Sequence, residues 1–200
     1  LKAPAAISIW VINAYQLAIT ALLLPLSALG DRIGYRRVYL PGLAIFILGS
    51  AACAASGSLA MLIAARMFQG IGAAAIMSMN AALVRATYPQ ATLGRGIGYN
   101  ALVLSLSAAA GPSIAALILS AGAWPWLFLI NLPIGLASLI IGRRALPVVQ
   151  GHGRQPDYPS ALLSALTLGT LVYGGETLAR GEIATGAPLL TVALVAGVLL

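Results

Sequence analysis

Apolar stretches close to membrane-spanning length fill most of this chain, and only short polar turns separate them. A helix needs about 20 residues to cross the hydrocarbon core of a bilayer, and a helix satisfies its own backbone hydrogen bonds there. The sequence therefore predicts an all-α integral membrane protein, a helical bundle with about six full transmembrane helices and a truncated seventh. The predicted spans are Ala6–Leu29, Val38–Ala55, Leu59–Val84, Gly96–Ser120, Leu127–Ile141, Pro159–Tyr173 and the partial span Ala187–Leu200.

Composition narrows the class of protein further. Charged residues make up 8% of the 200 residues, whereas a soluble domain carries about 25%. The net charge of +7 does not indicate a nucleic-acid partner, because the basic residues are scattered through short turns. An enzyme is not expected either, since His152 and Cys53 are isolated in the sequence and no metal-binding spacing or phosphate loop occurs. The lipid bilayer is the first expected partner.

The arginines predict how the chain is oriented. Most of them fall on alternate turns. Of the turns between, those around Ser56–Ser58 and Ser120–Trp126 carry no charge, and Gly174–Gly186 carries Glu176, Arg180 and Glu182. The positive-inside rule then makes the arginine-rich turns cytoplasmic and places Leu1 outside, in a multi-pass protein of the inner or plasma membrane. The tryptophans and most interfacial tyrosines fit the same orientation, as outer and inner aromatic belts. The outer residues are Trp10, Trp124 and Trp126; the inner ones are Tyr35, Tyr39 and Tyr88.

Arg66 is a cation within an apolar run of the third span. On insertion scales a charge at this depth costs ~2.5–3.5 kcal/mol, so it usually faces a cavity and a partner or a travelling proton. The alternative is an arginine that snorkels to the interface, because the Ser56–Ser58 turn is eight residues upstream, about 12 Å along a helix. We favour the functional interpretation.

Three spans each carry one polar stripe at helical spacing. Together they predict a bundle around a water-accessible cavity, although each amide or hydroxyl could instead bond a neighbouring helix for roughly 0.6 kcal/mol. The stripes are Asn13, Gln16 and Thr20; Arg66, Gln69 and Asn80; and Asn100, Ser107 and Gly111. Ser107, Gly111 and Ala115 also form a small-residue face for close helix contact, and Pro112 is expected to kink this span.

Several segments resemble the major facilitator superfamily, in particular its fourteen-helix drug:proton antiporter branch. Residues 27–37 resemble the family's signature between helices two and three, with Ser27 in place of its opening glycine. Leu62, Arg66, Gln69, Gly70 and Gly72 match the helix-four motif of proton-coupled members. Gly98, Ser107, Gly111 and Pro112 resemble the helix-five antiporter motif, and residues 10–15 and 124–135 are also similar to this branch.

The resemblance implies a division of the chain. Residues 1–142 would be helices two to six of an N-terminal transmembrane bundle, 143–157 a basic cytoplasmic linker, and 158–200 two further helices of the central region. The chain would then be part of a longer protein, lacking helix one with its membrane-embedded aspartate and the C-terminal half against which this bundle rocks. A twelve-helix member would also continue from a basic central loop.

The resemblance also implies roles for individual residues. Arg66, Gln69, Gly70 and Gly72 would serve proton coupling and transport. A cytoplasmic latch would comprise Gly30, Asp31, Arg32, Gly34, Arg36 and Arg37, although Gly30, Asp31 and Gly34 could simply form a tight turn. The antiporter helix would use Gly98, Ser107, Gly111 and Pro112, and the cavity lining would include Asn13, Tyr15, Gln16, Asn80, Asn100 and Asn131.

The expected function is proton-coupled export of amphipathic small molecules by alternating access. A proton gradient would drive it, so protons are partners and no cofactor or metal is expected. Two alternatives stay open: a proton-coupled carrier for an amino acid, siderophore or sugar, and a non-transporting membrane receptor or assembly protein with the same fold.

Overall fold

The computed structural model describes residues 5–149, 158–179 and 183–198, and this part of the chain is helical without strands. The predicted all-α membrane class is confirmed. Five helical segments are long and apolar enough to cross a membrane, and α7 and α8 contribute the shorter apolar segments Leu163–Gly175 and Thr185–Gly197. The elements are α1 (Ala5–Ile33), α2 (Tyr35–Ala54), α3 (Leu59–Thr87), the 3-10 turn η1 (Gln90–Thr92), α4 (Leu93–Ala121), α5 (Trp126–Leu129), α6 (Asn131–Ala145), α7 (Tyr158–Ala179) and α8 (Ile183–Val198).

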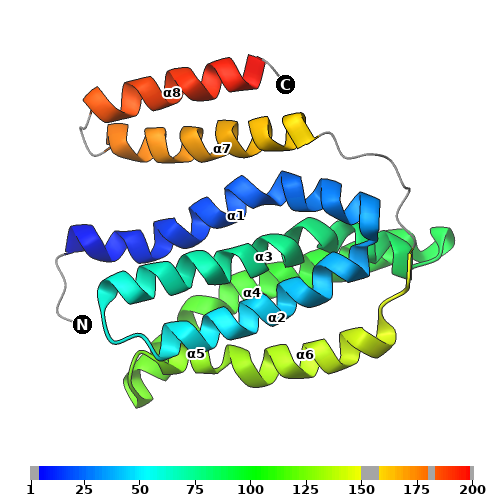
Figure 1. Ribbon diagram of the computed structural model, residues 1–200. Helices are drawn as coiled ribbons and strands as arrows, with labels where there is room; N and C mark the ends of the chain where they lie inside the picture. The colour runs from blue at the N-terminus through cyan, green and yellow to red at the C-terminus, as the bar shows by residue number, and fades with distance from the viewer. Residues whose placement is uncertain (1–4, 150–157, 180–182, 199–200) are drawn as a thin grey trace.

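The helices are stacked side by side with α3 near the centre (Figure 1). α1 and α2 both pack against α3, α6 covers the far side of α2, and α7 joins α8 to the outer side of α1. A ring contact of 5.8 Å between the Trp10 and Tyr173 centroids ties α7 to α1. One end of the bundle carries the start of α2 and the end of α6; we call it the arginine end, because Arg36 and Arg143 meet there.

The glycines of α2 and α3 bring the two helix backbones into contact. A Cβ added at Gly49 would lie 2.6 Å from the Gln69 Cα, and one added at Gly72 would lie 2.6 Å from the Gly42 carbonyl oxygen. Gly70 faces α1 instead, where its added Cβ would lie 2.8 Å from the Tyr15 carbonyl oxygen. The expected close packing at Gly70 and Gly72 is therefore present, and we call the α2–α3 contact the glycine seam.

The junction between α1 and α2 is shorter than the sequence suggested. We expected a turn at Gly30, Asp31 and Gly34, but α1 continues through Asp31 to Ile33. Gly34 alone makes the corner, with φ of 101°, a backbone angle that favours glycine. The tight-turn interpretation is wrong for Gly30 and Asp31, because their peptide groups stay in the helix.

Two other predicted segments differ in detail. The span expected from Leu127 to Ile141 is divided at Ile130 into α5 and α6. The loop expected over residues 174–186 is helical to Ala179, so Glu176 belongs to α7. The predicted linker starts inside α6, which ends at Ala145, and its residues 150–157, with Arg154, lie outside the described residues, as do Arg180 and Glu182.

Candidate functional site

Arg66 lies half-buried on α3 and reaches into the bundle. Its Nε donates to the Val11 carbonyl oxygen over 3.2 Å, and its Nη1 donates to the Gln69 Oε1 over 2.6 Å. Its Cζ lies 3.9 Å from the centroid of the Tyr15 ring and 5.8 Å from that of Phe128. A guanidinium over an aromatic face gains ~0.5–2 kcal/mol, most when it is desolvated. The side chain is thus fixed by neighbours on α1, α3 and α5 rather than directed along its own helix toward the turn at Ser58.

Gln69 extends this set of contacts to α2 and α6. It is 1% exposed, and its Nε2 donates to the Ser50 Oγ over 2.6 Å. The Ser50 hydroxyl donates in turn to the Phe46 carbonyl oxygen over 2.9 Å, and Asn131 Nδ2 approaches the same Oγ at 3.4 Å. The Cys53 thiol lies 3.8 Å from the Gln69 Oε1. We call Arg66, Gln69, Ser50 and Asn131 the Arg66 network.

The helix geometry explains why these side chains meet. Arg66 and Gln69 are three positions apart, so they lie on one face of α3. Gly70 admits the α1 backbone, which brings the Val11 carbonyl and the Tyr15 ring to Arg66. Gly49 admits α3 to α2, which brings the next residue, Ser50, to Gln69. The small residues therefore build the site by letting the helices approach.

The described partners of Arg66 are all neutral: a carbonyl, a carboxamide and two aromatic rings. Neutral acceptors satisfy the N–H groups of a guanidinium but leave its charge uncompensated. A positive charge held in this way favours the ionised form of a carboxylate placed near it. The network can thus hold a cation at fixed geometry and polarise an approaching acid.

The residues predicted to line a cavity divide into three groups. Tyr15 and Asn131 line a cavity of about 280 Å³ between α1, α2, α3 and α6. Asn80 donates to the Asn100 side-chain oxygen over 3.2 Å, so this pair bonds α3 to α4, as the alternative interpretation of the stripes proposed. Asn13 is half-buried and Gln16 is exposed, and neither is among the residues that line this cavity.

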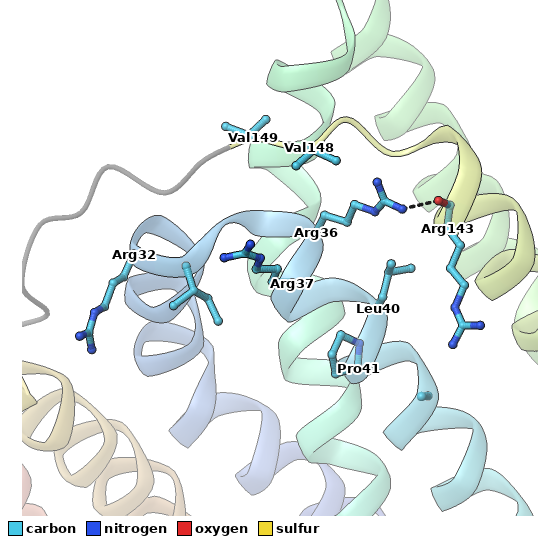
Figure 2. Close-up of a pocket in the computed structure, with 10 residues that line it drawn as sticks. Arg32, Arg36, Arg37, Leu40, Pro41, Arg143, Val148 and Val149 are labelled. Atoms are coloured by element: carbon cyan, nitrogen blue, oxygen red, sulfur yellow. Dashed lines mark hydrogen bonds between the residues drawn. The ribbon is translucent and has the colours of Figure 1, made fainter.

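The predicted latch residues gather at the arginine end, where contacts are described for Arg36 and Asp31. Arg36 donates to the Arg143 and Leu146 carbonyl oxygens and so holds the end of α6. Asp31 forms a side-chain hydrogen bond with Tyr35. Arg32 and Arg37 line a hollow with Arg36 and Arg143 (Figure 2).

The predicted antiporter helix is the least covered part of the described chain. Gly98, Ser107, Gly111 and Pro112 are all exposed on α4. An added Cβ at Gly98 or Gly111 would meet nothing within 4 Å. The small-residue face has no helix against it in the described residues, so its close packing stays a prediction.

Ser50 and Cys53 were missed by sequence reasoning, although both are fully buried beside Gln69. One signal was available. Ser50 follows Gly49 in a span that is otherwise apolar around it, and a glycine next to a hydroxyl often marks a helix contact in membranes.

The model of the Major Facilitator Superfamily matches residues 1–200. The chain belongs to this superfamily. Among curated relatives, this member is 51% identical over 184 residues to the uncharacterized transporter YebQ of Escherichia coli, covering 91% of this chain and 40% of that protein. It is 39% identical to the methylenomycin A resistance protein of Bacillus subtilis, covering 95% of this chain and 41% of the relative.

A third curated relative is named for the solute that it transports. The riboflavin transporter RibZ of Clostridioides difficile is 37% identical over 158 residues, which cover 78% of this chain and 35% of that protein. The chain thus spans about two fifths of the length of these relatives. Family membership and several apolar helices make it a multi-pass membrane protein.

Proposed function

We propose that the protein is a proton-coupled secondary transporter that exports drugs or other small amphipathic molecules by alternating access. Its arginine end would face the cytoplasm of the inner or plasma membrane, as the positive-inside rule implies. Superfamily membership supports transport in general. The names of relatives support export, since several are resistance or export proteins, for example for methylenomycin A and tetracenomycin C.

The observation that carries proton coupling is Arg66 among neutral partners. A cation in a membrane-spanning helix is costly, and functional sites are where that cost is usually retained. In our proposal a carboxylate, from a part of the protein outside the described residues, alternates between a proton and the Arg66 guanidinium. Gln69 holds the guanidinium in place through its 2.6 Å hydrogen bond. Loading of substrate and of proton would then favour different states of the bundle.

The test is transport in inverted vesicles from cells that express the protein. With an acidic lumen, a fluorescent cationic dye should accumulate inside the vesicles. Arg66→Ala should lower the initial rate at least tenfold at matched expression, because the fixed charge is lost. Arg66→Lys should retain an intermediate rate, since lysine keeps the charge but not the planar fork.

The matched control is Arg95→Ala. It removes the same charge from an exposed position, whose described bond stays on its own helix. It should leave the rate within twofold. Equal rates for Arg66→Ala and the unaltered protein would contradict proton coupling through this residue.

One alternative substrate class has its own support. The relative named a riboflavin transporter makes a carrier for another solute the second candidate. Flavin uptake into cells, measured beside dye export, separates the two candidates. Uptake of flavin without export of dye would replace the first proposal with the second.

A further inference from the structure

One hollow lies at the arginine end, away from the Arg66 network. It has a volume of about 750 Å³, within the range of small-ligand sites. Its wall brings together residues from the end of α1, the start of α2 and the end of α6. Arginines make up its polar part, and Leu40, Pro41 and Ala44 make up one apolar side.

The arginines that line the hollow make different contacts. Figure 2 shows Arg36 extending from α2 to the backbone of α6, above Leu40 and Pro41, with Val148 and Val149 beyond it. Its N–H groups cover the Arg143 and Leu146 carbonyl oxygens, which belong to the electronegative end of α6. By occupying these acceptors, Arg36 reduces the repulsion that an anion in the hollow would meet. Arg37 and Arg143 are exposed beside it.

The charge of the hollow is one-sided. No carboxylate is among its lining residues in the described part of the chain. Asp31, the one acid whose side chain is described, bonds Tyr35 instead. Guanidinium groups bind phosphate oxygens in pairs of parallel hydrogen bonds. A phosphate is therefore one anion that these donors suit, as they also suit a carboxylate.

The apolar side of the hollow distinguishes between sources of phosphate. Leu40 and Pro41 are adjacent on α2, and Ala44 lies about one turn further along this helix, which continues as a membrane-spanning helix. A ligand with phosphate at the arginines and hydrocarbon along α2 would satisfy both surfaces. Basic pockets between transmembrane helices at the cytoplasmic side suit anionic lipid headgroups in this way.

We propose that this hollow binds the headgroup of an anionic phospholipid. Arg37 and Arg143 attract the anionic headgroup from opposite sides of Arg36, which keeps α6 in place between them, and an acyl chain runs along Leu40 and Pro41 (Figure 2). The bound lipid bridges the α1–α2 corner to the end of α6, which are far apart in sequence. This assignment is independent of the transported substrate and of Arg66.

Native mass spectrometry of the detergent-purified protein tests the proposal. The probes are phosphatidylglycerol and phosphatidylcholine with identical acyl chains. The dissociation constant for the first bound phosphatidylglycerol molecule should be at least tenfold lower than that for phosphatidylcholine. Arg37→Gln with Arg143→Gln should weaken it about thirtyfold, because each cation near an anionic headgroup contributes roughly fivefold. Unchanged binding in this double variant would overturn the assignment.

The matched control is Arg85→Gln with Arg95→Gln. Both residues are exposed arginines outside the hollow, and the described hydrogen bonds of both stay on their own helices. This pair should bind phosphatidylglycerol within twofold of the unaltered protein. If this pair loses as much affinity for phosphatidylglycerol as Arg37→Gln with Arg143→Gln, the lipid is attracted to positive charge in general. The proposal of a site in the hollow would then be wrong.

Further variants and probes separate the remaining explanations. Arg37→Lys with Arg143→Lys keeps both charges and should hold the lipid more tightly than the glutamine pair; an equal loss would overturn a site based on charge. Millimolar inorganic phosphate should not displace the lipid, and displacement would make the site one for free anions.

Discussion

Arg66 and Gln69, one turn apart on α3, are joined by a 2.6 Å hydrogen bond from Nη1 to Oε1. Gln69 is 1% exposed and also donates to Ser50. One carboxamide therefore links the intramembrane cation to the neighbouring helix. The stability of the bundle and the position of the cation depend on the same side chain.

Replacing Gln69 by leucine is expected to lower the free energy of unfolding by about 1–3 kcal/mol, the usual cost of leaving buried polar partners unsatisfied. Ser50→Ala should cost less, because Gln69 keeps its bond to Arg66. Thermal unfolding in detergent, followed by circular dichroism, measures both. The control is Gln90→Leu at an exposed position in the 3-10 turn η1. Equal stability of Gln69→Leu and Gln90→Leu would show that the network contributes nothing.

Alanine in the glycine seam should destabilise the bundle. Gly72→Ala places a methyl group against the Gly42 carbonyl oxygen, and overpacking of this kind costs about 1–3 kcal/mol. Gly98→Ala meets nothing within 4 Å and should gain up to ~1 kcal/mol of helix propensity. The fraction of folded protein in size-exclusion chromatography compares the two. A stable Gly72→Ala variant would contradict the described α2–α3 contact.

The exposed face of α4 gives a different expectation for Gly111. Gly111→Val should leave unfolding of the described bundle unchanged, because an added Cβ at Gly111 meets nothing within 4 Å. It should nevertheless impair transport if this face packs against another surface during the transport cycle, which only a small residue permits. Unfolding and vesicle transport are measured on the same preparation. Normal transport by Gly111→Val would refute the close-packing role of this face.

The bond between Asn80 and Asn100 should couple α3 to α4. Interhelical polar pairs in membranes contribute about 0.6 kcal/mol on average and up to ~1.7. A double-mutant cycle with Asn80→Leu and Asn100→Leu should therefore give a coupling energy of this size. A cycle with Asn80→Leu and Gln16→Leu provides the reference, because these residues lie on α3 and α1 and no hydrogen bond is described between them. If the effects on stability are additive in both cycles, the bond between Asn80 and Asn100 does not couple α3 to α4.

The orientation can be tested by labelling single cysteines in a Cys53→Ala background. Cysteine at Gly57, which is exposed with no neighbour within 4 Å, should react with a membrane-impermeant maleimide in intact cells. Cysteine at Gln90 should react only after the cells are opened. The reverse pattern would place the arginine end outside and contradict the orientation inferred from the arginines.

Helix boundaries were predictable where a cap marks them. The start of α3 at Leu59 was predicted correctly, since Ser58 accepts a hydrogen bond from the Met61 N–H over 3.2 Å. The end of α1 was not, because hydropathy marks the edge of the hydrocarbon whereas the helix continues through Asp31 into the interface. The break between α5 and α6 had a readable signal in Pro133, which sits in the first turn of α6.

The candidate site was predictable only along a single helix. The spacing of Arg66 and Gln69 indicated a shared face, and the structure joins them. Ser50 reaches Gln69 from another helix, and that contact depends on how closely α2 and α3 approach. No local pattern specifies such an approach, because it results from glycines on both partners acting together.

The glycine seam has a consequence for how the protein is made. α2 and α3 are connected by the short turn Ala55–Ser58 and meet through their backbones, so they can leave the translocation machinery as a preformed hairpin. Arg66 would then enter the lipid already bonded to Gln69 and, through it, to Ser50 of the hairpin partner. A bulky residue in the glycine seam would separate α2 from α3 and leave the Arg66 cation unbonded to the hairpin partner during synthesis. The first observable effect would be degradation of the protein by cellular quality control.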